Sequence, residues 1–485
     1  MQSMMNLVIV MKVIKNYLYN VGYQVLAIIV PLITSAYVSR VLRPAGVGAN
    51  AFTNSIIQYF ILFASMGIGY YGNRQIAYVR ENRKKMAKTF WEIQIVKTIM
   101  TLASFIAFEV FMIFYTRQAD YMWAQSINLV AVAFDISWFY EGIENFKVTV
   151  LKNSFVKIVS MIAIFVFIKN PSDVTLYIIV LAISTLLGNL TLWPNIRRDL
   201  PKISYKILNP WQHFLPMVEL FIPQIATQVY VQLNKTMLGG MVNETASGYY
   251  QYSDNLVKLI LALVTATGTV MLPHVANAVS KGNMQKVKQM LYKSFDFVSA
   301  LSYPMMFGLA SISLTLAPKY YGSGYEPVGP AMMIESIVIL IIAWSNALGV
   351  QYLLPIHHQR DFTISVTVGA VVNIILNVPL IHTWGLYGAM WSTVISEISV
   401  TLYQLWAVRG LLSYKKLFSN SWKYLIAGII MFIPVFWMNQ NLKDSWLMMG
   451  IEVIVGVIIY GVMVILLRAP IVGQAKELIK NRCGK

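Results

Sequence analysis

Residues 248–256 have the sequence GYYQYSDNL, and they match residues 48–56, GANAFTNSI, at an offset of 200 residues without a gap. Glycine, aromatic, hydroxyl, Asn/Asp and aliphatic positions coincide in the two stretches. The same offset places Gln224 over Gln24, and it places the basic segment 281–288 over the basic segment that begins at Arg74. Because many membrane proteins are built from duplicated halves, we expect two copies of one structural unit.

The composition is that of an integral membrane protein. Of 485 residues, 57% are hydrophobic and only 12% are charged, compared with about 25% charged residues in soluble domains. Fourteen apolar runs have the length of about 20 residues that crosses a bilayer. They cover residues 17–39, 47–71, 90–115, 121–140, 151–169, 173–193, 214–239, 247–273, 290–316, 329–354, 362–382, 386–408, 422–439 and 445–467. The predicted fold class is therefore all-α, with about 14 transmembrane helices.

The distribution of Lys and Arg predicts the topology. An even number of spans puts both termini on one side, and most of the 38 Lys and Arg residues fall in loops on that side. By the positive-inside rule we expect both termini in the cytoplasm and a multi-pass protein of the cytoplasmic membrane. The net charge of +18 is explained by these loops, so nucleic acid is not an expected partner.

The duplication predicts the organisation of the chain. Six spans separate the two copies, so both have the same orientation and are related by a pseudo-twofold axis along the membrane normal. We expect an N-terminal lobe at 1–205, a C-terminal lobe at 206–412, and two further helices with a cytoplasmic tail at 413–485. Two facing lobes enclose a cleft whose exposure alternates as they rock, which favours a carrier over a channel.

A polar stripe runs along the seventh span. Gln224, Gln228, Gln232 and Lys235 follow each other at steps of four, four and three residues, and so share a helix face. A lysine at the centre of a lone bilayer helix costs about 2.5–3.5 kcal/mol, so this face is expected to meet water or protein instead of lipid. Comparable stripes are Asn16, Asn20 and Gln24 in the first span and Gln251, Asp254, Asn255 and Lys258 in the eighth.

Lys97, Lys235 and Lys258, which lie within spans, suggest an anionic ligand such as a phosphate or pyrophosphate. Neighbouring Asn and Gln side chains suit sugar hydroxyls, because each amide both donates and accepts hydrogen bonds. The predicted substrate-binding residues are Lys97, Lys235, Lys258, Asp254, Asn20, Gln24, Gln224, Gln228, Gln232 and Asn255. Asp254 and Lys258 are also an i, i+4 pair, so mutual neutralisation stays open for them.

Acidic residues within spans are candidates for ion coupling, namely Asp135, Glu109 and Glu397. Glu335 and Glu397 equally admit protonation or packing against a hydroxyl group. The choice between a proton and a sodium gradient stays open. No phosphate-binding loop, Ser/His/Asp set or Cys/His metal spacing is present, and the single cysteine is Cys483. We therefore predict no catalytic residue, no metal site, no cofactor and no enzymatic activity.

Several motifs resemble a known family. They are Ser39–Gly48 (SRVLRPAGVG), Asn234–Gly239 (NKTMLG), Gly248–Tyr250, Val270–His274 (VMLPH), Asn373–Asn377 (NIILN), Gly385–Ala389 (GLYGA) and Ser396-Glu397. Together they resemble bacterial polysaccharide-repeat flippases of the Wzx type, within the multidrug/oligosaccharidyl-lipid/polysaccharide exporter superfamily. This resemblance implies a two-lobed exporter that moves undecaprenyl-pyrophosphate-linked oligosaccharide to the outer leaflet for capsule, exopolysaccharide or O-antigen assembly. It also implies membrane lipid, a polysaccharide polymerase and chain-length proteins as partners. Relatives usually carry an acidic residue where this chain has Asn234, so Lys235 lacks a charged sequence neighbour.

Three other functions are alternatives. A cation-coupled multidrug exporter of the same superfamily needs a cleft dominated by carboxylates, and lysines would repel cationic drugs. A lipid II flippase usually shows arginines early in the first span, where this chain has Asn16, Asn20 and Gln24. A polymerase or ligase of the same pathway acts in large outward loops, and the outward loops expected here are short.

Overall fold

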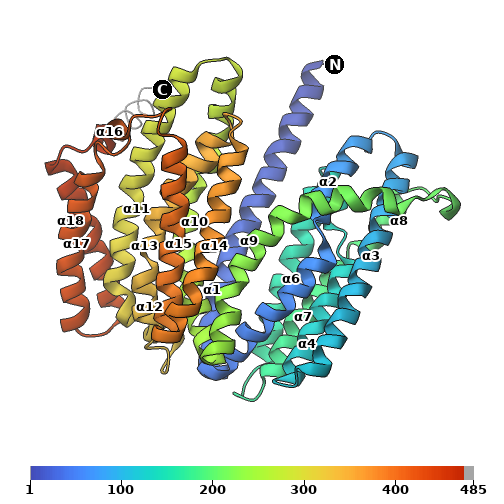
Figure 1. The fold of residues 1–485 in the computed structure, drawn as a ribbon, viewed down its shortest axis with the longest axis horizontal. Helices are drawn as coiled ribbons and strands as arrows, with labels where there is room; N and C mark the ends of the chain where they lie inside the picture. The colour runs from blue at the N-terminus through green and yellow to red at the C-terminus, as the bar shows by residue number, and fades with distance from the viewer. Residues whose placement is uncertain (1, 474–485) are drawn as a thin grey trace. The chain divides into compact units, whose positions relative to one another are not determined.

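The computed structural model describes the backbone of residues 2–473. Side chains are described for residues 26–473, apart from residues 197, 205, 222, 223, 226, 227, 267, 269, 270 and 273. The predicted site residues Asn20 and Gln24 therefore lie outside the described side chains. Within residues 2–473 the chain forms helices and short connections and no β-strand (Figure 1). This confirms the predicted all-α fold class.

The chain divides into two compact units, Met1–Thr236 and Met237–Lys485. The first unit holds α1 (Gln2–Ser65), α2 (Ile68–Val79), α3 (Arg83–Phe114), α4 (Ala119–Phe134), α5 (Ser137–Gly142), α6 (Phe146–Phe167), α7 (Val174–Leu190), α8 (Trp193–Asp199), the 3₁₀ turns η1 (Tyr205–Ile207) and η2 (Pro210–His213), and most of α9 (Phe214–Met241). The predicted lobe limits at 205, 206 and 412 follow the sequence repeat, and they stay a prediction about the lobes.

The second unit holds α10 (Glu244–Ser280), α11 (Met284–Tyr321), α12 (Val328–Glu335), α13 (Ile337–Leu348), the π-turn η3 (Gly349–Leu353), α14 (Gln359–Trp384), α15 (Leu386–Ala407), α16 (Tyr414–Leu417), α17 (Ser421–Asn441) and α18 (Trp446–Leu466). Helix α17 packs against α11 and α18, and α14 pairs with α15 (Figure 1). The α14–α15 pair is tight at Gly388, where a Cβ atom would lie 1.8 Å from the carbonyl oxygen of Leu380.

Local sequence explains where several helices begin and break. The side chain of Asn82 caps α3 by accepting from the backbone N–H groups of Lys84 and Lys85 at 3.1 and 3.0 Å. Helix α1 breaks at Arg43, which has a φ of 61° and directly precedes Pro44. Because proline disfavours a helical conformation in the residue before it, the break falls between the first two predicted spans.

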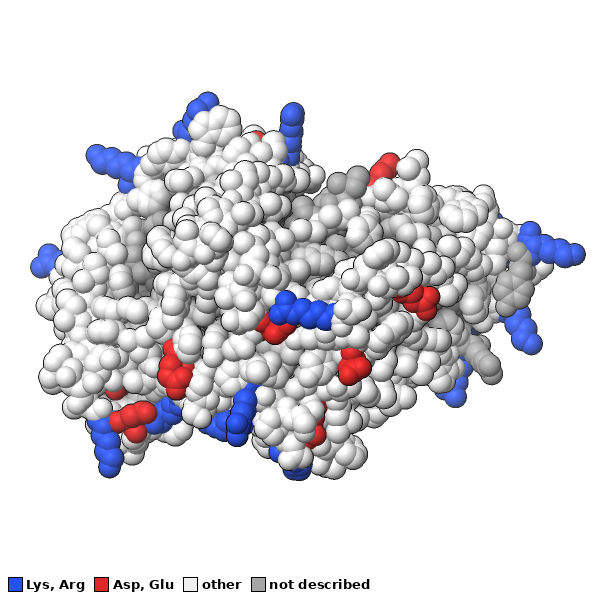
Figure 2. Space-filling model, turned by 60° about the horizontal axis from the view of Figure 1, so that its bottom comes forward, with Lys and Arg blue, Asp and Glu red and all other residues white. Residues whose placement is uncertain are grey.

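The outward faces of the helices are apolar, as expected for contact with lipid. On α18, Leu447, Val457 and Ile465 are exposed by 72%, 67% and 61%. In Figure 2, most of the face shown carries neither basic nor acidic side chains, and several of the acidic ones lie next to basic ones. Exposed apolar surface of this extent is suited to hydrocarbon.

Nine segments among the described residues are long and apolar enough to cross a membrane. The first, Leu26–Val79, covers two predicted spans. Helices α4, α9, α10 and α15 coincide with four further predicted spans. The structure is thus that of a multi-pass membrane protein, and the number fourteen stays a prediction.

Candidate functional site

The first unit contains a partly buried charged network, which we call the Asp135 network and which comprises Lys97, Asp135, Ser137 and Lys152. The carboxylate of Asp135 accepts from the hydroxyl of Ser137 at 2.6 Å and from its backbone N–H at 3.1 Å. Lys152, on α6, lies 3.5 Å from the same carboxylate and donates to the Ser137 hydroxyl at 3.0 Å. The four groups therefore form one hydrogen-bonded unit at the junction of α3, α4, α5 and α6.

Lys97 takes a different part in this network. Its ammonium group donates to the backbone carbonyl of Asp135, and the residue is only 3% exposed. The carbonyl is available because α4 ends at Phe134 and α5 begins at Ser137. The sequence pattern predicted Lys97 as a ligand contact, and the structure places it where it holds the break between two helices.

A cavity of about 400 Å³ lies in the same unit. It is lined by Ser65, Gly67, Ile68, Gly69, Tyr70, Asn73, Glu141 and Gln224. The side chain of Glu141 hydrogen-bonds to Asn73, and partial burial raises the pKa of its carboxyl group. This Gly67 pocket thus brings one predicted site residue, Gln224, together with an acidic residue that the sequence had not singled out.

The other residues of the α9 stripe have different surroundings. Gln224 donates to the backbone carbonyl of Leu220 at 3.1 Å, so its amide makes one hydrogen bond within its own helix. Gln228 is exposed, Gln232 is 9% exposed, and Lys235 is partly buried. The Oε1 atom of Gln232 is buried without a hydrogen-bond partner. The stripe is therefore continuous in sequence but mixed in exposure.

The second unit contains a cluster of polar and charged side chains on α10, α12 and α15. We call it the Glu335 cluster, and it comprises Ser253, Asp254, Lys258, Glu335 and Glu397. Lys258 lies 2.7 Å from Asp254 Oδ2. The Ser253 hydroxyl donates to Glu335 Oε2 at 2.6 Å, and the side chains of Asp254 and Glu335 are also hydrogen-bonded to each other. Glu397 is close enough to interact electrostatically with Lys258.

Exposure within this cluster is graded. Glu335 is 1% exposed. The side chain of Asp254 is 15% exposed and that of Lys258 is 52% exposed. Asn255, next to Asp254 in sequence, is exposed as well. The cluster thus leads from a buried carboxyl group to an accessible ammonium group.

The predicted residue Glu109, and Tyr252 of α10, lie in other surroundings. Glu109 is exposed on α3, on the same side as Leu102, Ile106 and Ile113, which are exposed by 60%, 60% and 72%. Its carboxyl group therefore belongs to the apolar outer face of that helix. Among the tyrosines of α10, Tyr252 stacks on Tyr321 with ring centres 4.3 Å apart, so this ring belongs to the core.

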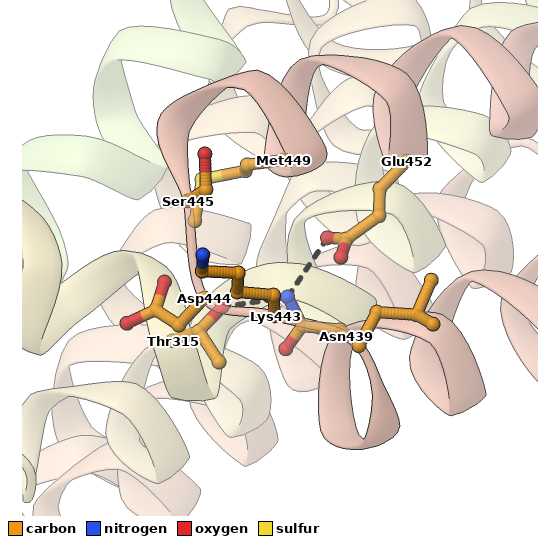
Figure 3. Close-up of a pocket in the computed structure, with 8 residues that line it drawn as sticks. Thr315, Asn439, Lys443, Asp444, Ser445, Met449 and Glu452 are labelled. Atoms are coloured by element: carbon orange, nitrogen blue, oxygen red, sulfur yellow. Dashed lines mark hydrogen bonds between the residues drawn. The ribbon is translucent and has the colours of Figure 1, made fainter.

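A small polar cavity of about 10 Å³ lies where α11, α17 and α18 meet (Figure 3). Its amide, Asn439 Nδ2, donates to Thr315 at 2.6 Å and to Glu452 at 2.9 Å. Figure 3 shows these side chains converging from the three helices. The volume matches a single water molecule, so we assign this cavity to helix packing.

An open basic cavity of about 580 Å³ lies at the turn between α10 and α11. It is lined by His274, Asn277, Ala278, Lys281, Asn283, Lys286 and Met290. Lys281 and Lys286 are exposed, in the turn after α10 and in the first turn of α11, on the predicted cytoplasmic side. The positive-inside rule accounts for them.

Sequence inspection missed Lys152, Ser137 and Ser253 as partners within these clusters. A signal for Lys152 existed, because it lies inside the fifth apolar run. The two serines are ordinary in helices and became visible only through their contacts. No group of three or more His, Cys, Asp or Glu side chains that could hold a metal occurs in the part of the chain whose side chains are described.

The comparisons with known proteins agree on one class. The profile of a family described as "Polysaccharide biosynthesis protein" matches residues 13–279. A relative named "Putative O-antigen transporter", from Escherichia coli K12, is 21% identical over 405 residues, which cover 82% of this chain and 96% of the relative. The lipid II flippase MurJ of Bacillus subtilis is 25% identical over 188 residues, covering 38% of this chain and 35% of that protein.

Solved structures share the fold. An inward closed structure of a lipid II flippase MurJ superposes with a TM-score of 0.76 at 16% identity, covering 94% of this chain and all of the other. An inward-facing multidrug transporter of the MATE family superposes with a TM-score of 0.62 at 12% identity, covering 79% of this chain and 96% of the other. At these identities the likeness shows the fold alone.

Proposed function

This chain belongs to the family of polysaccharide biosynthesis proteins, and from that premise we propose that it is a flippase for lipid-linked oligosaccharides. Its substrate would be an undecaprenyl-pyrophosphate-linked repeat unit, carried from the cytoplasmic to the outer leaflet by alternating access between two lobes. The E. coli relative named as an O-antigen transporter supports this class of cargo, because the alignment covers nearly all of that relative.

The observation that carries the proposal is the accessibility of polar groups on membrane helices. On α10 the Lys258 side chain is 52% exposed and Asn255 is exposed, and on α9 Gln228 is exposed. Polar side chains facing hydrocarbon are costly, so these faces are expected to line a hydrated path. An ammonium group suits a pyrophosphate, and the amides suit sugar hydroxyls.

The remaining predicted contacts divide by their surroundings. Lys235, Gln232 and Gln224 stay candidates on the α9 stripe. Lys97 is engaged with the backbone of Asp135, so we propose that it acts by holding the α4–α5 junction in place. We propose that its replacement affects transport through the fold of the first unit.

The cellular setting is part of the proposal. We expect both termini in the cytoplasm, insertion in the cytoplasmic membrane, and cooperation with a polysaccharide polymerase and chain-length proteins. Fusing a reporter that is fluorescent only in the cytoplasm to the C-terminus tests the orientation. A dark fusion at normal protein levels would refute it.

The decisive experiment identifies the cargo. Deletion of the gene should cause undecaprenyl-linked oligosaccharides to accumulate on the cytoplasmic side, and mass spectrometry of the lipid extract reports their sugars. Restoring the wild-type chain should clear them, whereas Lys258→Gln should clear them more slowly. Lys319→Gln is the matched control, because Lys319 pairs with Asp444 outside the proposed path. Unchanged lipid intermediates after deletion would contradict the proposal.

The same experiment separates the alternatives. Accumulation of lipid II would indicate a peptidoglycan flippase, and altered resistance to cationic drugs with normal lipids would indicate a multidrug exporter. The similarity to structures of both kinds is a similarity of fold, so it favours neither.

A further inference from the structure

Each unit places one carboxylate, Asp135 or Glu335, at a break in a helix. Asp135 follows the last residue of α4, two residues before α5 begins, and Glu335 is the last residue of α12, two residues before α13 begins. The helix before the break has 16 residues in α4 and eight in α12. Both units therefore carry an acidic group at a broken helix, at different distances from the start of that helix.

The carboxylates of Asp135 and Glu335 have different groups beside them to balance their charge. Asp135 has Lys152 at 3.5 Å, and Lys97 donates to its backbone carbonyl. Glu335 has a serine hydroxyl at 2.6 Å and the carboxyl group of Asp254. Ionised Asp135 is therefore balanced by cations in its own network, whereas Glu335 faces another acid.

Two carboxyl groups that share a hydrogen bond need a proton between them, because an ionised carboxylate only accepts. The contacts indicate which group carries it. Asp254 is paired with Lys258 at 2.7 Å and is the more exposed of the two, so it is the ionised partner. Glu335 is 1% exposed, and burying its charge there would be costly. The proton therefore sits on Glu335 and points to Asp254.

The neighbouring elements provide few other charges. On α10 the facing groups are Asp254 and Lys258, and on α15 the charged group is Glu397, which interacts with Lys258. Helix α13 carries no charged residue. On α11, Asp296 hydrogen-bonds to Tyr424 and Lys319 pairs with Asp444, and the other charged residues are Lys286, Lys288 and Lys293 near its first residue. If the proton left, Glu335 and Asp254 would both be ionised beside Lys258.

We propose that Glu335 and Asp254 form a binding site for a single proton in the second unit. Asp135 is the carboxylate at the broken helix of the first unit, and cations balance its charge. A route for the proton runs from Glu335 through Asp254 to the exposed end of Lys258. Loss of the proton leaves a charge at the α12–α13 break, which favours opening of that break to water. That this proton drives flipping rests on the proposed function.

The site itself can be tested without transport. Infrared difference spectra of the purified full-length protein, recorded between acidic and alkaline buffer, report the C=O stretch of a protonated carboxyl group. The wild type should show this band, Glu335→Gln should lose it, and Asp135→Asn should keep it. Loss of the band in Asp135→Asn, or its survival in Glu335→Gln, would overturn the assignment.

Two further measurements keep the result interpretable. Glu335→Asp retains a carboxyl group and should recover a band, which shows that loss in the glutamine variant is chemical and not a folding failure. A rise in thermal midpoint with sodium over potassium chloride, present in the wild type and absent in Glu335→Gln, would indicate a metal cation in place of the proton and would overturn the proposal.

Coupling is tested separately in vesicles that contain the substrate lipid. Collapse of a pH gradient should slow flipping by the wild type and leave flipping by Glu335→Gln unchanged. If no lipid is flipped at all, the proposed function fails while the infrared result stands. Equal sensitivity of both proteins to the gradient would refute the coupling step.

Discussion

The imidazole Nε2 of His213 lies 3.0 Å from the carboxylate Oε2 of Glu92, and both residues are buried. On its other side, Nδ1 of His213 is 2.7 Å from the hydroxyl of Tyr71. Because the carboxylate only accepts, the N–H at Nε2 is the donor to Glu92. These contacts connect the segment before α9 to α2 and α3.

Glu92→Gln should therefore weaken the first unit. The carboxylate also accepts from the backbone N–H of Asn209 at 2.7 Å and from the Gln212 amide at 2.9 Å. Losing hydrogen bonds to a buried charged group typically costs about 1.5–3 kcal/mol. The thermal midpoint of the purified protein should fall accordingly. Glu109→Gln, exposed on the same helix, is the control. An equal fall in both variants would show that the hydrogen bonds of Glu92 do not stabilise the first unit.

The Asp135 network predicts a coupling between two substitutions. Asp135→Asn and Lys152→Met each remove one end of the same chain of contacts, so their effects on unfolding should not add. A double-mutant cycle should give an interaction energy of about 0.5–3 kcal/mol. The matched cycle uses Lys157→Met, which lies on α6 without a described contact to Asp135. Additive effects in the first cycle would show that Lys152 and Asp135 act independently.

Contacts between residues one helical turn apart could be predicted from the sequence. Contacts between residues far apart in the chain could not. Asp254 and Lys258 are one helical turn apart, and the i, i+4 rule anticipated their pairing. The contact between Lys97 and the Asp135 carbonyl joins residues 38 positions apart on different helices. Periodicity assigns residues to a face of one helix, but it does not say which other helix meets that face.

The duplication does not predict which polar groups meet. Asp135 and Glu335 each lie at a broken helix, but the helix before the break has 16 residues in α4 and eight in α12. Asp135 lies beside Lys152, whereas Glu335 is hydrogen-bonded to Asp254. The repeat thus predicts the order of the helices, and contacts between helices decide the chemistry of each carboxylate.

The loop before α7 predicts a pH dependence. The backbone N–H groups of Lys169 and Asn170 each donate to Asp173 Oδ2 at 2.8 Å, and these bonds lower the pKa of Asp173. A lowered pKa in the folded state stabilises the fold above the usual Asp value of about 3.9, and this contribution disappears as the pH falls through the folded value. The difference in thermal midpoint between wild type and Asp173→Asn should therefore shrink on acidification. A constant difference would refute this linkage.

The contact between α17 and the neighbouring helices gives a prediction with a rescue. Asn439→Leu removes the amide that donates to Glu452, which is 3% exposed, and should lower stability by about 1–3 kcal/mol. Adding Glu452→Leu should restore much of the loss, because two apolar groups replace both partners. Asn441→Leu, exposed near the end of the same helix, is the control. Failure of the double variant to recover would show that the cavity has a role beyond packing.

The junction of α1 and α2 allows a comparison between two glycines of one pocket. Gly67 has a φ of 72°, and an added Cβ would lie 3.2 Å from the carbonyl oxygen of Met217 and 3.2 Å from the amide nitrogen of Phe221. Gly69 lies in α2 and has nothing within 4 Å of an added Cβ. Gly67→Ala should cost about 1–2 kcal/mol through backbone strain alone and displace α9 locally. Gly69→Ala should be neutral or slightly stabilising, because alanine is the better helix former. Thermal midpoints of the two variants decide the matter, and equal midpoints would mean that the Gly67 turn adapts to a side chain.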